Sequence, residues 1–274
     1  MKVIVTGSKG MLGTDLFLEL AKTDFEVIAW DYSDFDITNK PDMQKLILEK
    51  PNVVINCAAY TNVDLAETEK EKCALINIEG VKNLTLACKE CDSILIQIST
   101  DYVFDGTKES YNETDVKNPV NYYGETKSKG EDFIINNLKN YYIVRTSWLF
   151  GKNGKNFVDT ISKLAKEKQE LKVVDDQKGK PTFTKDLSEA LIKLISTKMP
   201  FGVYHITNSN ICSWFEFAKK IVEINKSNCV VKPCTTLDFP RPAKRPKFSV
   251  LNNNKFNLLR SWESALKEYL GVIE

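Results

Sequence analysis

The sequence has a single histidine, no excess of charge of either sign and no long apolar run. Its 274 residues include 38 lysines and arginines against 37 aspartates and glutamates, so the formal net charge is +1. A balance this even predicts neither nucleic acid nor an anionic membrane as a partner. No stretch reaches the roughly 18 apolar residues of a membrane-spanning helix, and the opening MKVIVTGSKG does not resemble a cleavable signal. We therefore expect a cytoplasmic protein that spans no membrane.

Cysteine is present, but in a pattern that argues against a metal or redox centre. The seven cysteines are an odd number and lie scattered along the chain. Cys88 and Cys91 form a C-x-x-C, yet no second pair stands at zinc-finger spacing, and the only histidine is His205. Free thiols in a reducing cytoplasm are the simpler interpretation.

The first half of the chain contains a regular alternation of apolar strands and amphipathic helices. Runs rich in valine and isoleucine predict strands at 2–6, 26–30, 52–59, 93–100 and 141–149. Helical spacing predicts helices at 11–22, 41–50, 73–91 and around Tyr123. Strands that are apolar on both faces and separated by helices are typical of a parallel sheet covered on two sides. We predict an α/β fold with a doubly wound parallel Rossmann sheet, in which residues 1–150 form a dinucleotide-binding domain.

Beyond residue 150 the alternation weakens. Further elements are predicted as helices near 157–168, 185–197, after Ser213 and at 262–270, with a short strand at 202–207. The stretch 230–252 is rich in proline, lacks periodicity and is interpreted as a surface segment. Residues 151–274 are therefore expected to form mainly a smaller C-terminal substrate-binding lobe, with some elements returning to the Rossmann domain.

Three glycines separate the first predicted strand from the first helix. In VTGSKGMLG, Gly7 permits a tight turn, Gly10 lets backbone N–H groups approach a pyrophosphate, and Gly13 lets the helix lie close to the strand. The spacing is G-x-x-G-x-x-G rather than G-x-G-x-x-G. Its position between a strand and a helix predicts dinucleotide binding.

The second predicted strand ends at an acidic turn. Asp31 stands where a carboxylate can accept hydrogen bonds from an adenosine ribose. The turn DYSDFD holds three acids and no lysine or arginine, so a 2′-phosphate would be repelled there and NADH is favoured. Asp36 and Ile37, just beyond, are expected to flank the adenine.

Only one of the two adjacent tyrosines has a lysine four places on. In a helix, Tyr123 and Lys127 share a face, whereas Tyr122 points about 140° away from Lys127. An ammonium beside a phenol favours the phenolate, so we expect Lys127 to lower the pKa of Tyr123. Such pairs are also common on solvated helices, and the rest of the site must support the assignment.

Other segments should meet this pair beyond the carboxyl ends of the strands. The third strand delivers Ala58 and Ala59, whose small side chains allow a cofactor close to the backbone, and the fourth delivers the hydroxyls of Ser99 and Thr100. A hydroxyl, a phenol and an ammonium beside a nicotinamide form a proton-donating set for carbonyl reduction. Thr100 would hydrogen-bond the carbonyl oxygen, Tyr123 would donate its proton, and Lys127 would hold the ribose.

Six segments carry a resemblance that runs over essentially the whole chain. CAAYTNVDLAE, STDYVFDG, YYGETKSKGE, RTSWLFG, DDQKGKPT and RPKFSVLN, with the glycine spacing and the Y-x-x-x-K pair, resemble the extended short-chain dehydrogenase/reductases and, among them, the family of dTDP-4-dehydrorhamnose reductases. The resemblance implies reduction of the C4 ketone of dTDP-4-dehydro-6-deoxy-L-mannose to dTDP-L-rhamnose, the last step of that pathway. The implied cofactor is NADPH or NADH, which weakens the preference for NADH.

The resemblance also implies roles for individual residues. The catalytic residues would be Thr100, Tyr123 and Lys127. The cofactor would contact Gly7, Gly10, Met11, Leu12, Asp31, Ala58, Ala59 and Tyr60. The dTDP-sugar would contact Asp101, Tyr102, Val103, Trp148, Gln177, Pro181, Thr182 and Arg245. A guanidinium at Arg245 suits a diphosphate, because it can bind it with two parallel hydrogen bonds.

Several alternatives remain open at this point. Another nucleotide-sugar reductase or epimerase fits the same scaffold, and so does a non-catalytic regulatory subunit like that of methionine adenosyltransferase. Some family members hold magnesium at a dimer interface, but the candidate acids Asp15, Glu189 and Glu263 show no recognisable ligand spacing. We predict no metal. The sequence leaves open whether the protein is a monomer or a homodimer, and which nucleobase it prefers.

Overall fold

The computed structural model describes residues 1–272, and its central feature is a six-stranded sheet. The strands are β1 (Lys2–Thr6), β2 (Glu26–Trp30), β3 (Val53–Asn56), β4 (Ile94–Thr100), β5 (Tyr141–Thr146) and β10 (Gly202–His205). They are all parallel and lie in the order β10-β5-β4-β3-β1-β2. The order reverses between β1 and β3, which makes their carboxyl ends the expected ligand-binding edge. The predicted doubly wound parallel sheet is confirmed.

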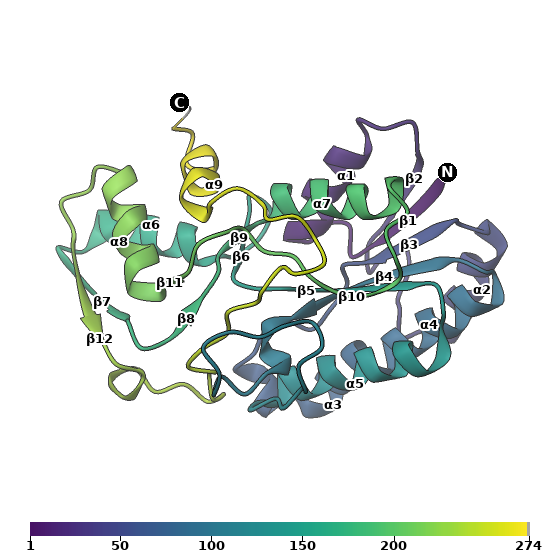
Figure 1. Ribbon diagram of the computed structural model, residues 1–274, viewed down its shortest axis with the longest axis horizontal. Coiled ribbons are helices and arrows are strands. Elements are labelled where there is room, and N and C mark those ends of the chain that lie inside the picture. The colour runs from purple at the N-terminus through teal and green to yellow at the C-terminus, as the bar shows by residue number, and fades with distance from the viewer. Residues whose placement is uncertain (273–274) are drawn as a thin grey trace.

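Helices cover both faces of the sheet (Figure 1). One face carries α1 (Met11–Leu20) and α7 (Thr184–Ser196), and the other carries α2 (Lys40–Glu49), α4 (Val81–Glu90) and α5 (Tyr122–Asn137). The side chains of β1 alternate between the two resulting cores: Val3 and Val5 face α1 and α7, whereas Ile4 packs on the opposite side. Burial on both faces explains why these strands are nearly continuous apolar runs.

The predicted helix 73–91 is helical throughout but not uniform. It consists of α3 (Lys70–Ala74), a π-helical turn η2 (Leu75–Gly80) and α4. The wide turn brings Asn77 into the interior, where its side-chain oxygen accepts from the Tyr60 backbone N–H at 2.9 Å and its amide donates to the Tyr60 carbonyl at 3.0 Å. The π-turn thus holds the loop that follows β3.

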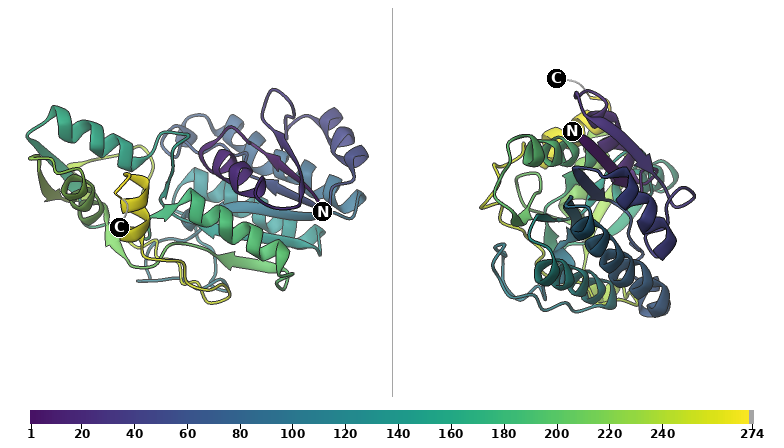
Figure 2. Two further views of the ribbon diagram at one scale, coloured as in Figure 1. Left: turned by 90° about the horizontal axis from the view of Figure 1, so that it is seen from above. Right: turned by 90° about the vertical axis from the view of Figure 1, so that its right-hand side faces the viewer.

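A smaller lobe is built from the second half of the chain. It contains α6 (Phe157–Glu167), β7 (Glu170–Val174), α8 (Trp214–Ile224), β12 (Val230–Cys234) and α9 (Trp262–Tyr269). Its core includes Phe150, Phe217 and Trp262. Helix α8 begins at Ser213, which forms a capping box with Glu216. Figure 2 shows this lobe beside the sheet, with α9 (yellow) at their junction.

Several short elements complete the fold. They are η1 (Leu65–Glu67), η3 (Asp101–Val103), β6 (Leu149–Phe150), β8 (Lys178–Gly179), β9 (Thr182–Phe183), β11 (Cys212–Ser213) and η4 (Thr236–Asp238). The predicted strand 141–149 is broken after Thr146, and β6 then pairs with β9 instead of continuing in the main sheet. Among the described residues, no helix combines the length and apolarity needed to cross a bilayer.

The interpretation of 230–252 as a surface segment holds for residues 230–242, which are all exposed or half-buried, and is wrong for Ala243 and residues 249–251, which are buried. Residues 230–234 form β12, which pairs in parallel with β7. Ala243 and Leu251 are buried, and Tyr111 donates its backbone N–H to the carbonyl of Val250 at 2.8 Å. Proline removes hydrogen-bond donors and periodicity, so the sequence pattern did not reveal a segment that packs against other loops.

Candidate active site

The glycine loop has the geometry that a dinucleotide requires. Gly7 has φ of 67°, and a Cβ there would lie 2.7 Å from the backbone nitrogen of Ala58. A Cβ on Gly13 would lie 2.2 Å from the Gly7 carbonyl oxygen, so this glycine lets α1 pack against the loop. Helix α1 begins after Gly10 without a side-chain cap. Its first N–H groups therefore face the ligand-binding edge, which fits a pyrophosphate.

The acidic turn lies next to the glycine loop. The backbone N–H of Lys9 lies 3.4 Å from Asp31 Oδ1. Lys45 Nζ donates to the carbonyl oxygen of Asp34 at 3.1 Å, so an ammonium lies beside a turn that lacks lysine in its own sequence. The Asp36 carboxylate accepts from the backbone and hydroxyl of Thr38, both at 2.8 Å. Ile37 is buried against Gly80. The argument against a 2′-phosphate, which considered the turn alone, is weakened by the positive charge of Lys45.

The loop after β3 runs past the glycine loop. Ala59 lines the same cavity as Gly10 and Gly13, and Ala58 contacts Gly7. Tyr60 is buried, and its hydroxyl donates to Glu69 at 3.0 Å. Cys57 also lines the cavity, and burial raises the pKa of its thiol to about 12. Cys57 was not predicted as a site residue, because nothing in the sequence marks a lone cysteine as a cavity residue.

One cavity brings the predicted cofactor and catalytic residues together. It has a volume of about 480 Å³ and is lined by residues from the ends of β3, β4 and β5, from α1 and from α5. Its lining includes Gly10, Met11, Leu12, Gly13, Ala59, Ser99, Thr100, Asp101, Tyr102, Tyr123, Lys127 and Trp148. Tyr122 is not among the residues that line it. The choice between the two tyrosines made from helical spacing is therefore consistent with the geometry.

Burial controls the ionisation of Tyr123 and Lys127, the predicted catalytic pair. It raises the pKa of Tyr123 above its usual range, against the effect of a hydrogen bond with Thr100. It lowers the pKa of Lys127 to about 8, opposed by the negative charge of Glu131. The Lys127 ammonium donates to the carbonyl oxygen of Ile98 at 2.8 Å. The expectation that Lys127 lowers the pKa of Tyr123 is wrong for this structure, because desolvation of the phenol dominates.

Residues 101–103 follow Thr100, a predicted catalytic residue, in the turn η3. The Thr100 hydroxyl donates to Asp101 Oδ1 at 3.0 Å, and burial raises the pKa of Asp101 to about 7. Tyr102 lines the cavity and meets the Tyr123 ring edge-on, with centroids 6.0 Å apart. Val103 lies elsewhere, in a small core cluster with Phe104.

A second cavity of about 430 Å³ adjoins the first, sharing Tyr102 and Trp214 with it. Its lining includes Asp64, Phe157, Lys172, Gln177, Phe239, Arg241 and Arg245. Arg245 Nη2 lies 2.9 Å from Asp64 Oδ1, and its guanidinium lies 5.7 Å from the centre of the Tyr102 ring. Arg245 Nη1 is buried and has no hydrogen-bond partner among the described residues. An unused buried donor on a guanidinium fits an anionic ligand such as a diphosphate.

Trp148 lines the first cavity and contacts Trp214, which lines both cavities. Its ring stacks on Trp214 with centroids 3.6 Å apart and planes inclined by 8°. Its φ of 49° turns the chain at the end of β5, and Gly179 leaves room for the indole, since a Cβ there would lie 2.5 Å from it. Trp214 was not predicted as a site residue, because a tryptophan at the start of an amphipathic helix resembles a core residue.

Not every predicted substrate residue lines a cavity. Gln177 lines the second cavity and donates to the Thr236 hydroxyl at 3.0 Å. Pro181 and Thr182 are buried beside it in sequence but line neither of the two cavities, and Thr182 pairs with Leu149 between β9 and β6. Their predicted contact with substrate stays a prediction.

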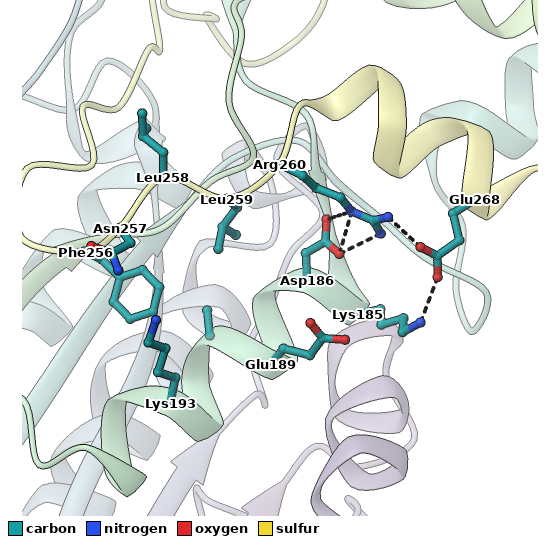
Figure 3. Close-up of a pocket in the computed structure, with 11 residues that line it drawn as sticks. Lys185, Asp186, Glu189, Lys193, Phe256, Asn257, Leu258, Leu259, Arg260 and Glu268 are labelled. Atoms are coloured by element: carbon teal, nitrogen blue, oxygen red, sulfur yellow. Dashed lines mark hydrogen bonds and ion pairs between the residues drawn. The ribbon is translucent and has the colours of Figure 1, made fainter. Parts of the chain in front are cut away.

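A third hollow, of about 420 Å³, lies away from this site, between α7 and residues 256–260, which precede α9 (Figure 3). Four of its charged groups form a network: Arg260 binds Asp186 at 2.7 Å and Glu268 at 2.6 Å, and Lys185 binds Glu268 at 2.7 Å. The network ties the last helix to the sheet side of the molecule. Across residues 1–272, no three His, Cys, Asp or Glu side chains gather closely enough to hold a metal ion.

The parallel sheet, the glycine loop and the tyrosine–lysine pair in one cavity define a class, the dinucleotide-binding proteins of the short-chain dehydrogenase/reductase type. Comparison with known proteins gives the particular family. The protein-family model of the RmlD substrate binding domain matches residues 1–274, so the chain belongs to this family. The resemblance stated from the sequence motifs is confirmed.

Solved and curated relatives agree with this assignment. The chain is similar to a dTDP-4-dehydrorhamnose reductase from Clostridium acetobutylicum, at 46% identity and TM-score 0.96 over 99% of each chain. A dTDP-4-dehydrorhamnose reductase from Bacillus anthracis, solved in complex with NADP, gives 41% identity and TM-score 0.95, again over 99% of each chain. The spore coat polysaccharide biosynthesis protein SpsK of Bacillus subtilis is 42% identical, covering 98% of this chain and 96% of its own.

Proposed function

We propose that this protein reduces the C4 ketone of dTDP-4-dehydro-6-deoxy-L-mannose to dTDP-L-rhamnose, with NADPH or NADH as the reductant. The observation that carries the proposal is the single cavity in which Thr100, Tyr123 and Lys127 adjoin the glycine loop. Membership of the RmlD family, two of whose solved relatives are dTDP-4-dehydrorhamnose reductases, supports the choice of substrate.

The cofactor fits the residues present, because Gly7, Gly10 and Gly13 leave a cradle that side chains would fill. When bound, the nicotinamide supplies the hydride. Tyr123, kept in its protonated form by burial, donates its phenolic proton to the ketone oxygen as charge develops there. The Thr100 hydroxyl orients that oxygen, and the Lys127 ammonium is placed to hold the ribose hydroxyls.

The second cavity would hold the rest of the nucleotide sugar. Arg245 offers its free Nη1 to the diphosphate, and the aromatic rings of Trp214 and Phe239 offer surfaces for the base. We assign the dinucleotide mainly to residues 1–150 and the dTDP-sugar mainly to residues 151–274. The cysteines are free among the described residues, which suits the reducing cytoplasm where we place the reaction.

One assay tests the proposal and separates it from its alternatives. The protein is mixed with dTDP-4-dehydro-6-deoxy-L-mannose and either NADPH or NADH, and the absorbance of the reduced nicotinamide is followed. Stoichiometric loss of absorbance is expected with at least one cofactor. An epimerase returns the hydride to the sugar and gives no net oxidation, and a regulatory subunit gives no reaction. Either of these results would refute the reductase assignment.

A further inference from the structure

A carboxylate one helical turn beyond Lys127 lies at the centre of a buried polar network. Glu131 is 1% exposed. Its Oε1 accepts from Ser99 Oγ at 2.5 Å and from Arg145 Nε at 3.0 Å, and its Oε2 lies 2.7 Å from Arg145 Nη2. Lys117 Nζ lies 3.3 Å from the same Oε2. Burial alone would raise the pKa of Glu131, but Arg145 and Lys117 hold it below the ordinary value, so the group is ionised.

The partners of Glu131 come from the elements that carry the catalytic residues. Ser99 immediately precedes Thr100 at the end of β4, and Arg145 lies opposite it in the β4–β5 register. Lys127 lies four residues before Glu131 on α5 and donates to the carbonyl oxygen of Ile98, the neighbour of Ser99. One carboxylate therefore joins the carboxyl ends of β4 and β5 to the helix that bears Tyr123 and Lys127.

We propose that Glu131 is a positioning residue for the reductase reaction: its buried carboxylate fixes α5 against β4 and β5, and so sets the place and the charge of Lys127 relative to Thr100. The proposal rests on the proposed function. A purely structural ion pair would stabilise the fold equally well without affecting Lys127, so the test must distinguish the two.

The charge of Lys127 provides that distinction. The titratable groups that face it are Cys57 after β3, Cys73 on α3 and Glu131 on its own helix, and burial is the main influence on its pKa. The two thiols remain protonated, since burial raises the pKa of both. Glu131 is therefore the facing charge that opposes desolvation and keeps the ammonium protonated near neutral pH.

The experiment measures the dissociation constant of NADPH against pH, by quenching of protein fluorescence, with no sugar present. In the wild type we expect affinity to fall as Lys127 loses its proton near pH 8. Glu131→Gln keeps the shape and loses the charge, so its midpoint should move down by about one pH unit, with affinity at pH 6 retained. Asp132→Asn is the matched control: it removes a carboxylate 2.7 Å from Lys117 that is exposed, and its midpoint should not move.

Each outcome decides the question. An unchanged midpoint in Glu131→Gln, whether or not thermal stability falls, overturns the proposal and leaves a structural ion pair. If Glu131→Gln does not fold, Glu131→Asp decides, because it keeps the charge, draws the carboxylate back from Ser99 and Arg145, and leaves the lining of the first cavity intact. A fall in kcat of about tenfold or more with unchanged NADPH affinity supports positioning, and wild-type kcat overturns it.

A wild type that binds NADPH but reduces no sugar refutes the proposed function alone, since the midpoint is measured without sugar. A wild type that binds no NADPH overturns both the proposed function and the role of Glu131.

Discussion

At the scale of single residues, burial sets the protonation states of the site. Tyr123 stays protonated, Lys127 is a weak acid near neutrality with a pKa of about 8, and the pKa of Asp101 is raised to about 7. A buried phenol that retains its proton is suited to act as a general acid, because the proton is available when the ketone oxygen gains charge.

This view predicts the effect of removing the phenolic hydroxyl. Tyr123→Phe should lower kcat at least a hundredfold, within the roughly 10²–10⁴-fold range of general acid catalysis, while the affinity for NADPH changes little. Steady-state kinetics and fluorescence titration measure the two quantities. Tyr122→Phe is the control and should retain nearly wild-type kcat. A comparable loss in Tyr122→Phe would transfer the role to the other tyrosine.

The raised pKa of Asp101 predicts that the stability of the fold depends on pH. Its pKa rises from an ordinary 3.8 to about 7 through burial. The folded state therefore binds more protons than the unfolded state between these values, and stability falls as pH rises through this window. Between pH 5 and pH 8 the wild type should lose about 1–3 kcal/mol more free energy of unfolding than Asp101→Asn, measured by urea denaturation.

Asp105 offers a control of opposite sign. A hydrogen bond from Tyr111 lowers the pKa of Asp105 from its ordinary 3.8, so its ionised form stabilises the fold above that pH and this stability is lost as pH falls below it. On lowering the pH below about 4, the wild type should lose more free energy of unfolding than Asp105→Asn, whereas between pH 5 and pH 8 the two should change alike. The same sign for both variants would contradict the assignment of burial as the cause at Asp101.

Residue-level prediction from sequence is consistent with the structure where a local rule applied. The i, i+4 spacing was enough to choose Tyr123 over Tyr122, because helix geometry alone fixes which side chain shares a face with Lys127. The direction of the Tyr123 pKa was missed, because desolvation depends on how many other elements cover the ring. Trp214 and Arg241 were missed for a similar reason: their approach to the cavity comes from lobe packing and not from a local pattern.

At the scale of elements, we expect two glycines of the glycine loop to have different roles: Gly13 allows α1 to pack against the loop, and Gly10 leaves space for the ligand. A Cβ on Gly13 would lie 2.2 Å from a backbone oxygen, whereas the nearest atom to a Cβ on Gly10 is 3.3 Å away. The two positions stand three residues apart in one strand–turn–helix, so the same substitution tests them under matched conditions.

We expect Gly13→Ala to lower the free energy of unfolding by about 1–3 kcal/mol, the usual cost of forcing a close contact. Gly10→Ala should leave stability nearly unchanged but weaken NADPH binding, because its methyl group would stand where the pyrophosphate approaches. Thermal denaturation and fluorescence titration provide both readouts. Equal loss of stability in the two variants would mean that neither glycine serves the ligand specifically.

Element prediction from sequence failed where long-range contacts set the structure. The strands of the sheet were recognisable because burial on both faces makes them apolar throughout. The π-turn at 75–80 was not, since it is the contact of Asn77 with Tyr60 that requires it. Strand β12 was not predicted, because its partner, β7, lies about sixty residues earlier. The burial of Leu251 was misjudged, because it pairs with Tyr111 from a distant loop.

At the scale of the whole molecule, the two cavities share Tyr102 from the sheet side and Trp214 from the lobe. A dTDP-sugar that occupies both would bridge the two parts of the chain. Arg245 is central to this, because it lies on a segment returning from the lobe and is held by Asp64 from the loop after β3.

Arg245→Gln should therefore raise the dissociation constant of dTDP about tenfold or more, the expected cost of losing a charge-assisted hydrogen bond. NADPH affinity should be unaffected, since Arg245 does not line the first cavity. Isothermal titration calorimetry with each ligand measures both constants. If Arg245→Gln lost NADPH binding instead, Arg245 would belong to the cofactor site and not to the dTDP-sugar site.

The position of β10 has a consequence for the synthesis of this protein. This outermost strand, Gly202–His205, pairs with β5 only after the chain has left the sheet and built much of the lobe. While the ribosome is still translating the intervening segment, the Tyr142–Arg145 edge has no neighbour, and unpaired strand edges invite association between nascent chains. The chain must therefore complete its sheet late, and a chain stalled after β5 has left the ribosome but before β10 has been made would expose this aggregation-prone edge to the cell.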